Sequence, residues 1–195
     1  RLCDWLAVRG PGPAGFERIA AFLAAHPDWP SRAALRRRAE AALLSERRDA
    51  RTTLAFFESE APLTTAGRLA LLQAQEASGR RGEAAELARR IWREDTLAPA
   101  TEARLVEAYG TVLTKADHRA RLERFLFQES WASALRTAAR LTPDHAKLVR
   151  ARQAVEGRAR TAGAALDAVP PSLRSDTSYL FSRAQWLRRQ GKFAE

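Results

Sequence analysis

Glu129 is the residue whose type and place in the sequence could do chemistry most directly. It stands in the run Gln128-Glu129-Ser130-Trp131, at the end of an apolar helical segment. A glutamic acid can act as general acid or general base when its carboxyl is partly buried and its pKa is raised. The next residues, 132–136, read as ordinary helix. We therefore interpret Glu129 as a solvated residue near a helix end, and we predict no catalytic residue in this chain.

Other reactive side chains are too few or too scattered to form a site. His26, His118 and His145 are too far apart in sequence for a pair of metal ligands, and two of them stand beside Asp at predicted helix starts, where surface or capping roles are expected. The single cysteine, Cys3, excludes an internal disulfide and is expected to be a small buried hydrophobe. Glycine-rich phosphate loops and nucleophile elbows are absent from the sequence. We predict neither a metal nor a cofactor.

The charge of the chain is carried almost entirely by arginine. The 33 basic and 23 acidic residues give a net charge of +10, and only three of the basic residues are lysines, so 30 are arginines. Such a ratio indicates genomic compositional bias, although a positive field still favours anionic partners. We interpret the arginine runs mostly as solvated helix faces, with the alternative that several line one concave surface and bind an anionic polymer. These runs are Arg36-Arg37-Arg38, Arg80-Arg81, Arg89-Arg90 and Arg188-Arg189. The five Trp are expected to pack in the core.

Helices must position all of these side chains, because apolar residues recur at helical spacing almost everywhere and no segment alternates like a strand. The pattern predicts about eleven or twelve short helices with short joints, so consecutive helices should be antiparallel. Within them, Asp117 is expected to be an N-cap, and Arg36 and Glu40 are expected on the polar face of their helix. No apolar run approaches the roughly 18 residues of a membrane span.

Two segments, around Gly79 and around Gly191, echo each other and predict the fold class. In each, an Ala/Leu/Arg-rich helix runs into a glycine, the residue that best takes the left-handed conformation after a helix end. The echo predicts an all-α superhelix (α-solenoid) of degenerate tetratricopeptide-like hairpins, since the tips do not recur at a strict interval. We expect residues 1–195 to be one domain. Because the sequence lacks Met and stops just after the second echo, we expect it to be truncated at both ends.

Two segments have a specific character: the motif around His26 to Pro30, within the run FLAAHPDWP at 22–30, and the block from Gly82 to Arg93. Further segments of the same kind follow at 39–43, 62–64, 117–122, 131–134 and 183–189. Together they resemble the N-terminal superhelical domain of soluble lytic murein transglycosylases of the alphaproteobacterial type. The Gln128-Glu129-Ser130 run also resembles the catalytic Glu-Ser element of that family. However, the Gly-Leu-Met-Gln core that follows it in the family is absent here, so no catalytic residue is carried over.

The resemblance implies a periplasmic, non-catalytic scaffold that binds or positions peptidoglycan glycan strands. The C-terminal lysozyme-like catalytic domain of such enzymes, which would be its partner in the parent protein, is not in this sequence. The chain alone should therefore be inert, while its parent would be a lytic transglycosylase. The alternative is a generic tetratricopeptide-like adaptor that binds protein. A helical-repeat RNA binder would fit the basic charge, but no strict register of base-reading positions is present, so nucleic acid is not the expected partner.

Overall fold

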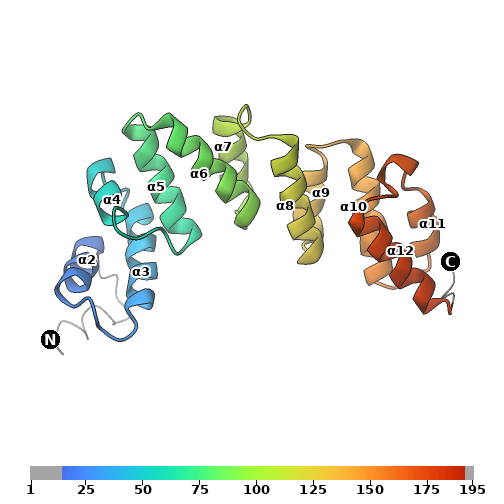
Figure 1. The fold of residues 1–195 in the computed structure, drawn as a ribbon, viewed down its shortest axis with the longest axis horizontal. Coiled ribbons are helices and arrows are strands. Elements are labelled where there is room, and N and C mark those ends of the chain that lie inside the picture. Colours follow the sequence, from blue (N-terminus) through green and yellow to red (C-terminus); the bar gives the residue numbers. More distant parts are fainter. Residues whose placement is uncertain (1–14, 192–195) are drawn as a thin grey trace. The chain divides into compact units, whose positions relative to one another are not determined.

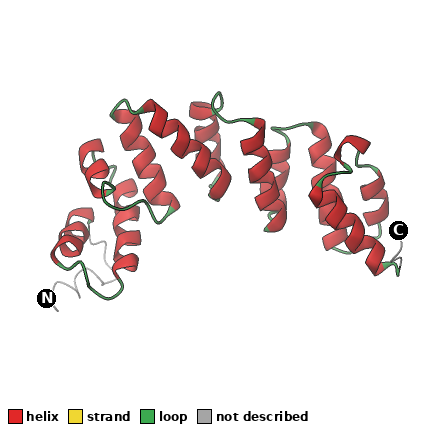
Figure 2. Ribbon diagram, viewed as in Figure 1, coloured by secondary structure: helices red, strands yellow, loops and turns green. Residues whose placement is uncertain are grey.

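The computed structural model of the chain describes residues 15–191, and within this range all regular structure is helical (Figure 2). Eleven α-helices and one 3-10 helix are described, in agreement with the predicted number. Their bounds are α2 Phe16–Ala25, α3 Arg32–Ser45, α4 Ala50–Phe56, α5 Thr65–Ala77, α6 Arg81–Glu94, α7 Pro99–Tyr109, α8 Lys115–Phe127, α9 Trp131–Ala138, α10 Pro143–Glu156, α11 Ala162–Asp167, η1 Pro171–Leu173 and α12 Thr177–Arg189. The all-α prediction is confirmed for these residues.

The described helices belong to two compact units. The first holds α2 to α5, most of α6 and α7, and the second holds the end of α6 (residues 92–94) and α8 to α12 (Figure 1). Within each unit, several helices that follow one another in sequence pack together, as α2 does on α3, α4 on α5, α8 on α9 and α10 on α11. Others pack on the next helix but one, as α3 does on α5 and α10 on α12. None of the helices in residues 15–191 combines the length and apolar character needed to cross a membrane.

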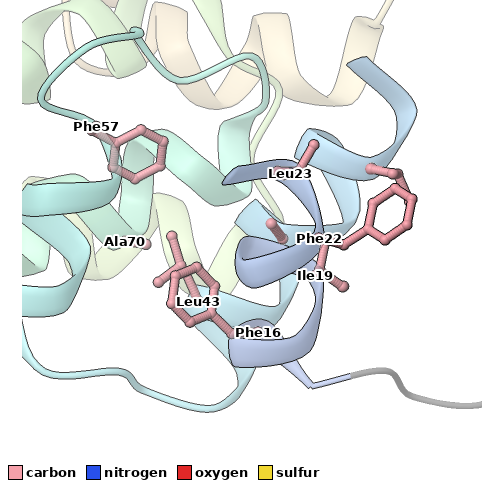
Figure 3. Packing of buried hydrophobic residues seen from close by; sticks show 9 residues of the cluster. Phe16, Ile19, Phe22, Leu23, Leu43, Phe57 and Ala70 are labelled. Atoms are coloured by element: carbon pink, nitrogen blue, oxygen red, sulfur yellow. The ribbon is translucent and has the colours of Figure 1, made fainter. Parts of the chain in front are cut away.

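In the first unit, the core forms where α2 lies against α3, α4 and α5. Phe16, Ile19, Phe22 and Leu23 from α2 meet residues of the other helices, among them Leu43 (Figure 3). Their spacing of three, three and one places all four α2 side chains on one helical face. The stripe is an instance of the helical spacing of apolar residues that the sequence predicts. The edge-to-face contact of Phe22 with Trp29, at 5.4 Å between ring centroids, fixes the turn that follows α2.

The second unit has two apolar clusters. One joins α8, α9 and α10 through residues such as Leu122, Phe125 and Val149, and the other joins α10, α11 and α12 through residues such as Leu166 and Tyr179. Because α10 contributes buried residues to both clusters, it links the two halves of this unit.

One type of turn ends five of the described helices. The residue two positions past the last helical residue has a positive φ in each case: 51° at Arg47, 71° at Gly79, 55° at Glu129, 53° at Arg158 and 72° at Gly191. The predicted left-handed conformation of Gly79 and Gly191 is thus confirmed. The same turn also recurs where the left-handed residue is not a glycine, at Arg47 after α3, Glu129 after α8 and Arg158 after α10.

The hydrogen bonds of these turns are those of the Schellman motif. After α8, the N–H of Ser130 donates to the carbonyl of Phe125 and the N–H of Glu129 donates to that of Leu126. The same pair of bonds follows α3, α5 and α10. They satisfy carbonyls that have no partner within the helix, and they turn the chain back towards the next helix. Four helix pairs, α3/α4, α5/α6, α8/α9 and α10/α11, are therefore closed in the same way.

Charged side chains that the sequence places on a solvated face are buried in α3. Arg36 is 4% exposed and Glu40 is fully buried, so the prediction of a polar outer face was wrong at these two positions. Both side chains bind the backbone that leads into α5. Arg36 donates to the carbonyls of Glu60 and Ala61, each at 3.1 Å. The Glu40 carboxylate accepts from the N–H of Thr64 and of the residue before it, each at 2.8 Å.

The start of α8 also differs from the prediction. Asp117 was predicted as the N-cap, but the N-cap is Thr114, whose hydroxyl accepts from the Asp117 N–H at 3.2 Å. Asp117 in turn accepts from the Thr114 N–H at 2.8 Å. This reciprocal pair is a capping box, in which an acid three residues into the helix can be as informative as one before it.

Exchanging Gly79 for alanine tests the turn against a matched position three residues away. Gly79→Ala is expected to destabilise the chain by about 1 kcal/mol, because a Cβ disfavours positive φ. Gly82→Ala, in the first turn of α6, is expected to stabilise it by about 0.5 kcal/mol through helix propensity. A Cβ at either position meets no atom within 4 Å, so sterics do not differ. Urea unfolding followed by circular dichroism measures both, and shifts of the same sign would contradict the assignment.

Gly67→Ala tests the buried carboxylate of Glu40. A Cβ at Gly67 would lie 2.6 Å from Cδ and 2.9 Å from Cγ of Glu40, which cannot retreat without losing its bonds to the start of α5. We expect a loss of about 2 kcal/mol in unfolding free energy. If Gly67→Ala is as stable as Gly82→Ala in urea unfolding, Glu40 does not occupy this place.

Candidate functional site

Residues of α3, of the turn after it, of α5 and of α7 line a groove of about 390 Å³ in the first unit. Residues of α5 at positions 69, 72, 73 and 76 and residues of α7 at positions 101, 104, 105, 108 and 109 line it. Both sets follow the spacing of three and four that defines one helical face. The floor is aliphatic, and its members are Leu44, Leu69, Leu72, Leu105 and Ala108.

A tyrosine–carboxylate pair stands at one side of the groove. The Tyr109 hydroxyl donates to Oε1 of Glu76 at 2.6 Å. Burial, followed by this hydrogen bond and the carboxylate charge, raises the pKa of the Tyr109 phenol above its usual value. Tyr109 is therefore a neutral donor whose proton is already used by Glu76.

Two arginines line the groove with free guanidinium groups. Arg47, in the turn after α3, and Arg104, on α7, are both exposed. Neither side chain makes a hydrogen bond or an ion pair with the described residues. Against the single carboxylate of Glu76, the lining carries two positive charges, so its formal charge is 2 − 1 = +1. The groove combines an aliphatic floor with cations that have room to bind a ligand.

Glu129 lies in the turn between α8 and α9, and nothing around it suits general acid catalysis. The residue is exposed and left-handed, and its backbone N–H closes the Schellman turn. The Glu129-Ser130 pair is therefore part of a turn, and the backbone N–H of Ser130 donates the second hydrogen bond of that turn. The interpretation of Glu129 as a residue near a helix end agrees with this geometry.

The three histidines do not come together. Within residues 15–191, no three His, Cys, Asp or Glu side chains form a group that could hold a metal ion. His145 lies at the start of α10, where its Nδ1 is 2.7 Å from the Thr142 hydroxyl. His26 contacts the ring of Phe22 after α2. The cysteine of the sequence, Cys3, lies outside the described residues.

Arginine has a structural task in the second unit that composition does not reveal. Its side chains donate to backbone carbonyls at the C-terminal ends of other helices, where the partial charge is negative. These bonds join Arg121 to Trp92 (2.6 Å), Arg124 to Arg93 (2.8 Å), Arg152 to Leu126 (3.2 Å), Arg174 to Asp167 (2.9 Å) and Arg189 to Val155. Among the predicted arginine runs, the buried Arg36 and the exposed Arg189 thus bind backbone carbonyls. The other exposed members are Arg37, Arg80, Arg81, Arg90 and Arg188.

Arg121 is the most buried of these cations. It has no exposed surface, and its Cζ lies 4.2 Å from the centre of the Trp92 ring and 4.7 Å from that of Phe125. Trp92 is itself fully buried, and Trp29, Trp131 and Trp186 pack against the apolar clusters. Core packing was the expected role of the Trp residues, and these four have it.

His118 packs edge-to-face on Trp92 with ring centroids 5.3 Å apart. Burial, then the charge of Arg140, lowers the pKa of His118; Asp117 opposes this shift and Arg121 adds to it. The folded chain therefore favours a neutral imidazole. Protonation of His118 would place a third positive charge beside two arginines.

This arrangement predicts a loss of stability in mild acid. Because the unfolded chain binds the His118 proton more readily than the folded one, the unfolding free energy is expected to fall as pH drops from 7.5 to 5.5, through the unfolded pKa of about 6.5. In His118→Gln the fall is expected to be smaller but still present, because burial also lowers the pKa of His145. Urea unfolding at several pH values measures it, and an equal slope in His118→Gln would contradict the cause.

No family model, no curated protein and no solved structure matches this chain.

The groove is the feature that sequence reasoning missed. The apolar stripe of α7, with Leu105, Ala108 and Tyr109, reads as a core-facing stripe, but Ala108 is exposed and Tyr109 half-buried. The sequence does contain one sign of the groove, because Arg104 interrupts the apolar stripe of α7 on the same face. Which helix lies opposite that face is a tertiary fact, and no pattern within α7 reports it.

Proposed function

We propose that the chain is a non-catalytic superhelical scaffold built from helical hairpins, and that it binds or positions peptidoglycan glycan strands for a lytic transglycosylase. Two findings support a repeat architecture of the solenoid kind. Four helix pairs are closed by the same Schellman turn, and neighbouring helices pack on one another within each unit. Each such hairpin needs its neighbour to bury its apolar face, which is the principle of helical-repeat proteins.

The observation that carries the non-catalytic part of the proposal is the setting of Glu129. A general acid on a glycosidic bond requires a carboxyl whose pKa is raised by burial, and Glu129 is an exposed turn residue. The link to murein rests on the resemblance of the segments from Phe22 to Pro30 and from Gly82 to Arg93. The basic charge of +10 is compatible with it, because the peptide stems of peptidoglycan carry carboxylates. A periplasmic location follows from the same proposal.

Co-sedimentation with purified sacculi tests the proposal. The full chain is expected to pellet with sacculi, to be released by salt, and to liberate no 1,6-anhydro-muropeptides on prolonged incubation. Glu129→Gly should behave as the unaltered chain does. Release of anhydro-sugars by the unaltered chain but not by Glu129→Gly would contradict the non-catalytic assignment. Failure to pellet at low salt, combined with tight binding of an RNA oligonucleotide with a steep salt slope, would contradict murein as the ligand.

The groove on the first unit favours a second candidate, a protein-binding adaptor. Its aliphatic floor, with Leu69 and Leu72 from α5 and Leu105 from α7, suits peptide side chains better than the hydroxyl-rich faces of a glycan. An adaptor needs the same helical hairpins and no enzyme partner. Capture of a defined peptide by a chain that ignores sacculi would favour this candidate over the scaffold.

A further inference from the structure

We propose that the groove between α5 and α7 binds an extended segment of a partner protein in which aliphatic side chains are flanked by carboxylates. The assignment concerns a binding site and a ligand class that go beyond the scaffold role. It holds whether or not the parent protein is an enzyme, because every residue it uses lies within the first unit.

The floor of the groove selects the aliphatic part of the ligand. Leu44, Leu69, Leu72 and Leu105 all line it, and Leu72 and Leu105 are almost completely buried, so the floor is firmly held. Apolar side chains of a bound segment would cover the half-exposed Leu44 and Leu69. A volume of about 390 Å³ lies at the small end of the range of ligand pockets, which suits a few side chains and not a folded domain.

The lining charges select the acidic part. Arg47 comes from the turn after α3 and Arg104 from α7, so the two cations reach the groove from different elements. Neither guanidinium is engaged by a described residue, whereas Glu76 already accepts from Tyr109. Free guanidinium groups bind carboxylates through paired, charge-assisted hydrogen bonds. A neutral peptide would form no ion pair with either cation, and a basic one would be repelled.

The conformation of Arg47 adds a reason why this cation is presented to a ligand. Its φ of 51° and the Schellman bonds of the turn fix its backbone at the end of α3, beside Leu44 of the floor. The backbone is therefore set before a ligand arrives, and only side-chain freedom is lost on binding.

Fluorescence anisotropy with the full chain tests the proposal. The probe is a fluorescein-labelled, C-terminally amidated peptide Glu-Leu-Leu-Ala-Leu-Glu, and the matched probe carries Gln in place of both Glu residues. We expect the acidic probe to bind and the Gln probe to bind about tenfold more weakly at low salt, with the difference shrinking as salt rises. Equal binding of the two probes, or no binding of the acidic one at millimolar chain, would overturn the proposal.

Variants locate the binding within the molecule. Arg47→Gln and Arg104→Gln are each expected to weaken the acidic probe about threefold, and the double variant about tenfold. Arg37→Gln removes the same charge from an exposed position of α3 outside the groove and is expected to change binding little. Circular dichroism checks that each variant keeps its helix content. Equal effects of Arg37→Gln and Arg104→Gln would show a non-specific charge effect and overturn the site.

A competition experiment with murein fragments separates this inference from the proposed function. Soluble muropeptides also carry carboxylates, so they are added as competitors of the bound probe. We expect no displacement at concentrations at which unlabelled peptide displaces the probe fully. Displacement by muropeptides would assign the groove to murein and overturn the protein-segment ligand. Retained sacculus binding in the Arg47→Gln, Arg104→Gln double variant would leave the scaffold proposal intact whatever the peptide result.

Discussion

The ends of the helices impose the constraint on which the rest of this structure depends. A short helix leaves four carbonyls without partners at its C-terminus, and a chain of eleven described helices must satisfy them repeatedly. The left-handed residue two positions past the helix solves this in four hairpins with the same two hydrogen bonds. The turn also sets the direction in which the chain leaves each of these helices, and in two of the four pairs, α8/α9 and α10/α11, the two helices pack on one another. Glycine provides it at Gly79, and strain is tolerated for it at Glu129.

Arginine satisfies further carbonyls of the helix ends in the second unit. Arg121 and Arg152 show how this works: each reaches from the face of one helix to the last turn of another, and each also packs on an aromatic ring. The guanidinium group of arginine is planar and carries several N–H donors, so it can donate to a carbonyl and pack on an aromatic ring at the same time. The ammonium group of lysine cannot make both contacts in this way. An arginine-rich composition can arise from genomic bias and still be used structurally. The free arginines at the groove, Arg47 and Arg104, differ from these because their guanidinium groups bind no described residue.

Hydrophobic periodicity was sufficient to predict the helices, because each apolar stripe, such as Phe16 to Leu23, reports directly which face is buried. It could not predict that Arg36 and Glu40 are buried, since their partners are loop backbone groups brought close only by tertiary packing. Nor could it find the left-handed Arg158, because the neighbouring Gly157 is the residue that a sequence pattern would choose, yet Gly157 has a φ of −73°. The groove was missed for a related reason: it depends on which helix lies opposite α7.

The same left-handed turn follows α3, α5, α8 and α10 whether or not its left-handed residue is glycine, so Glu129 is a turn residue. Solution NMR of the labelled chain, with the sign of φ read from cross-correlated relaxation, measures this turn residue by residue. Positive φ is expected at Arg47, Gly79, Glu129 and Arg158 alike. A negative φ at Glu129, with helical shifts continuing from Phe127 through Trp131, would contradict it, because α8 and α9 would then form one helix and not a hairpin.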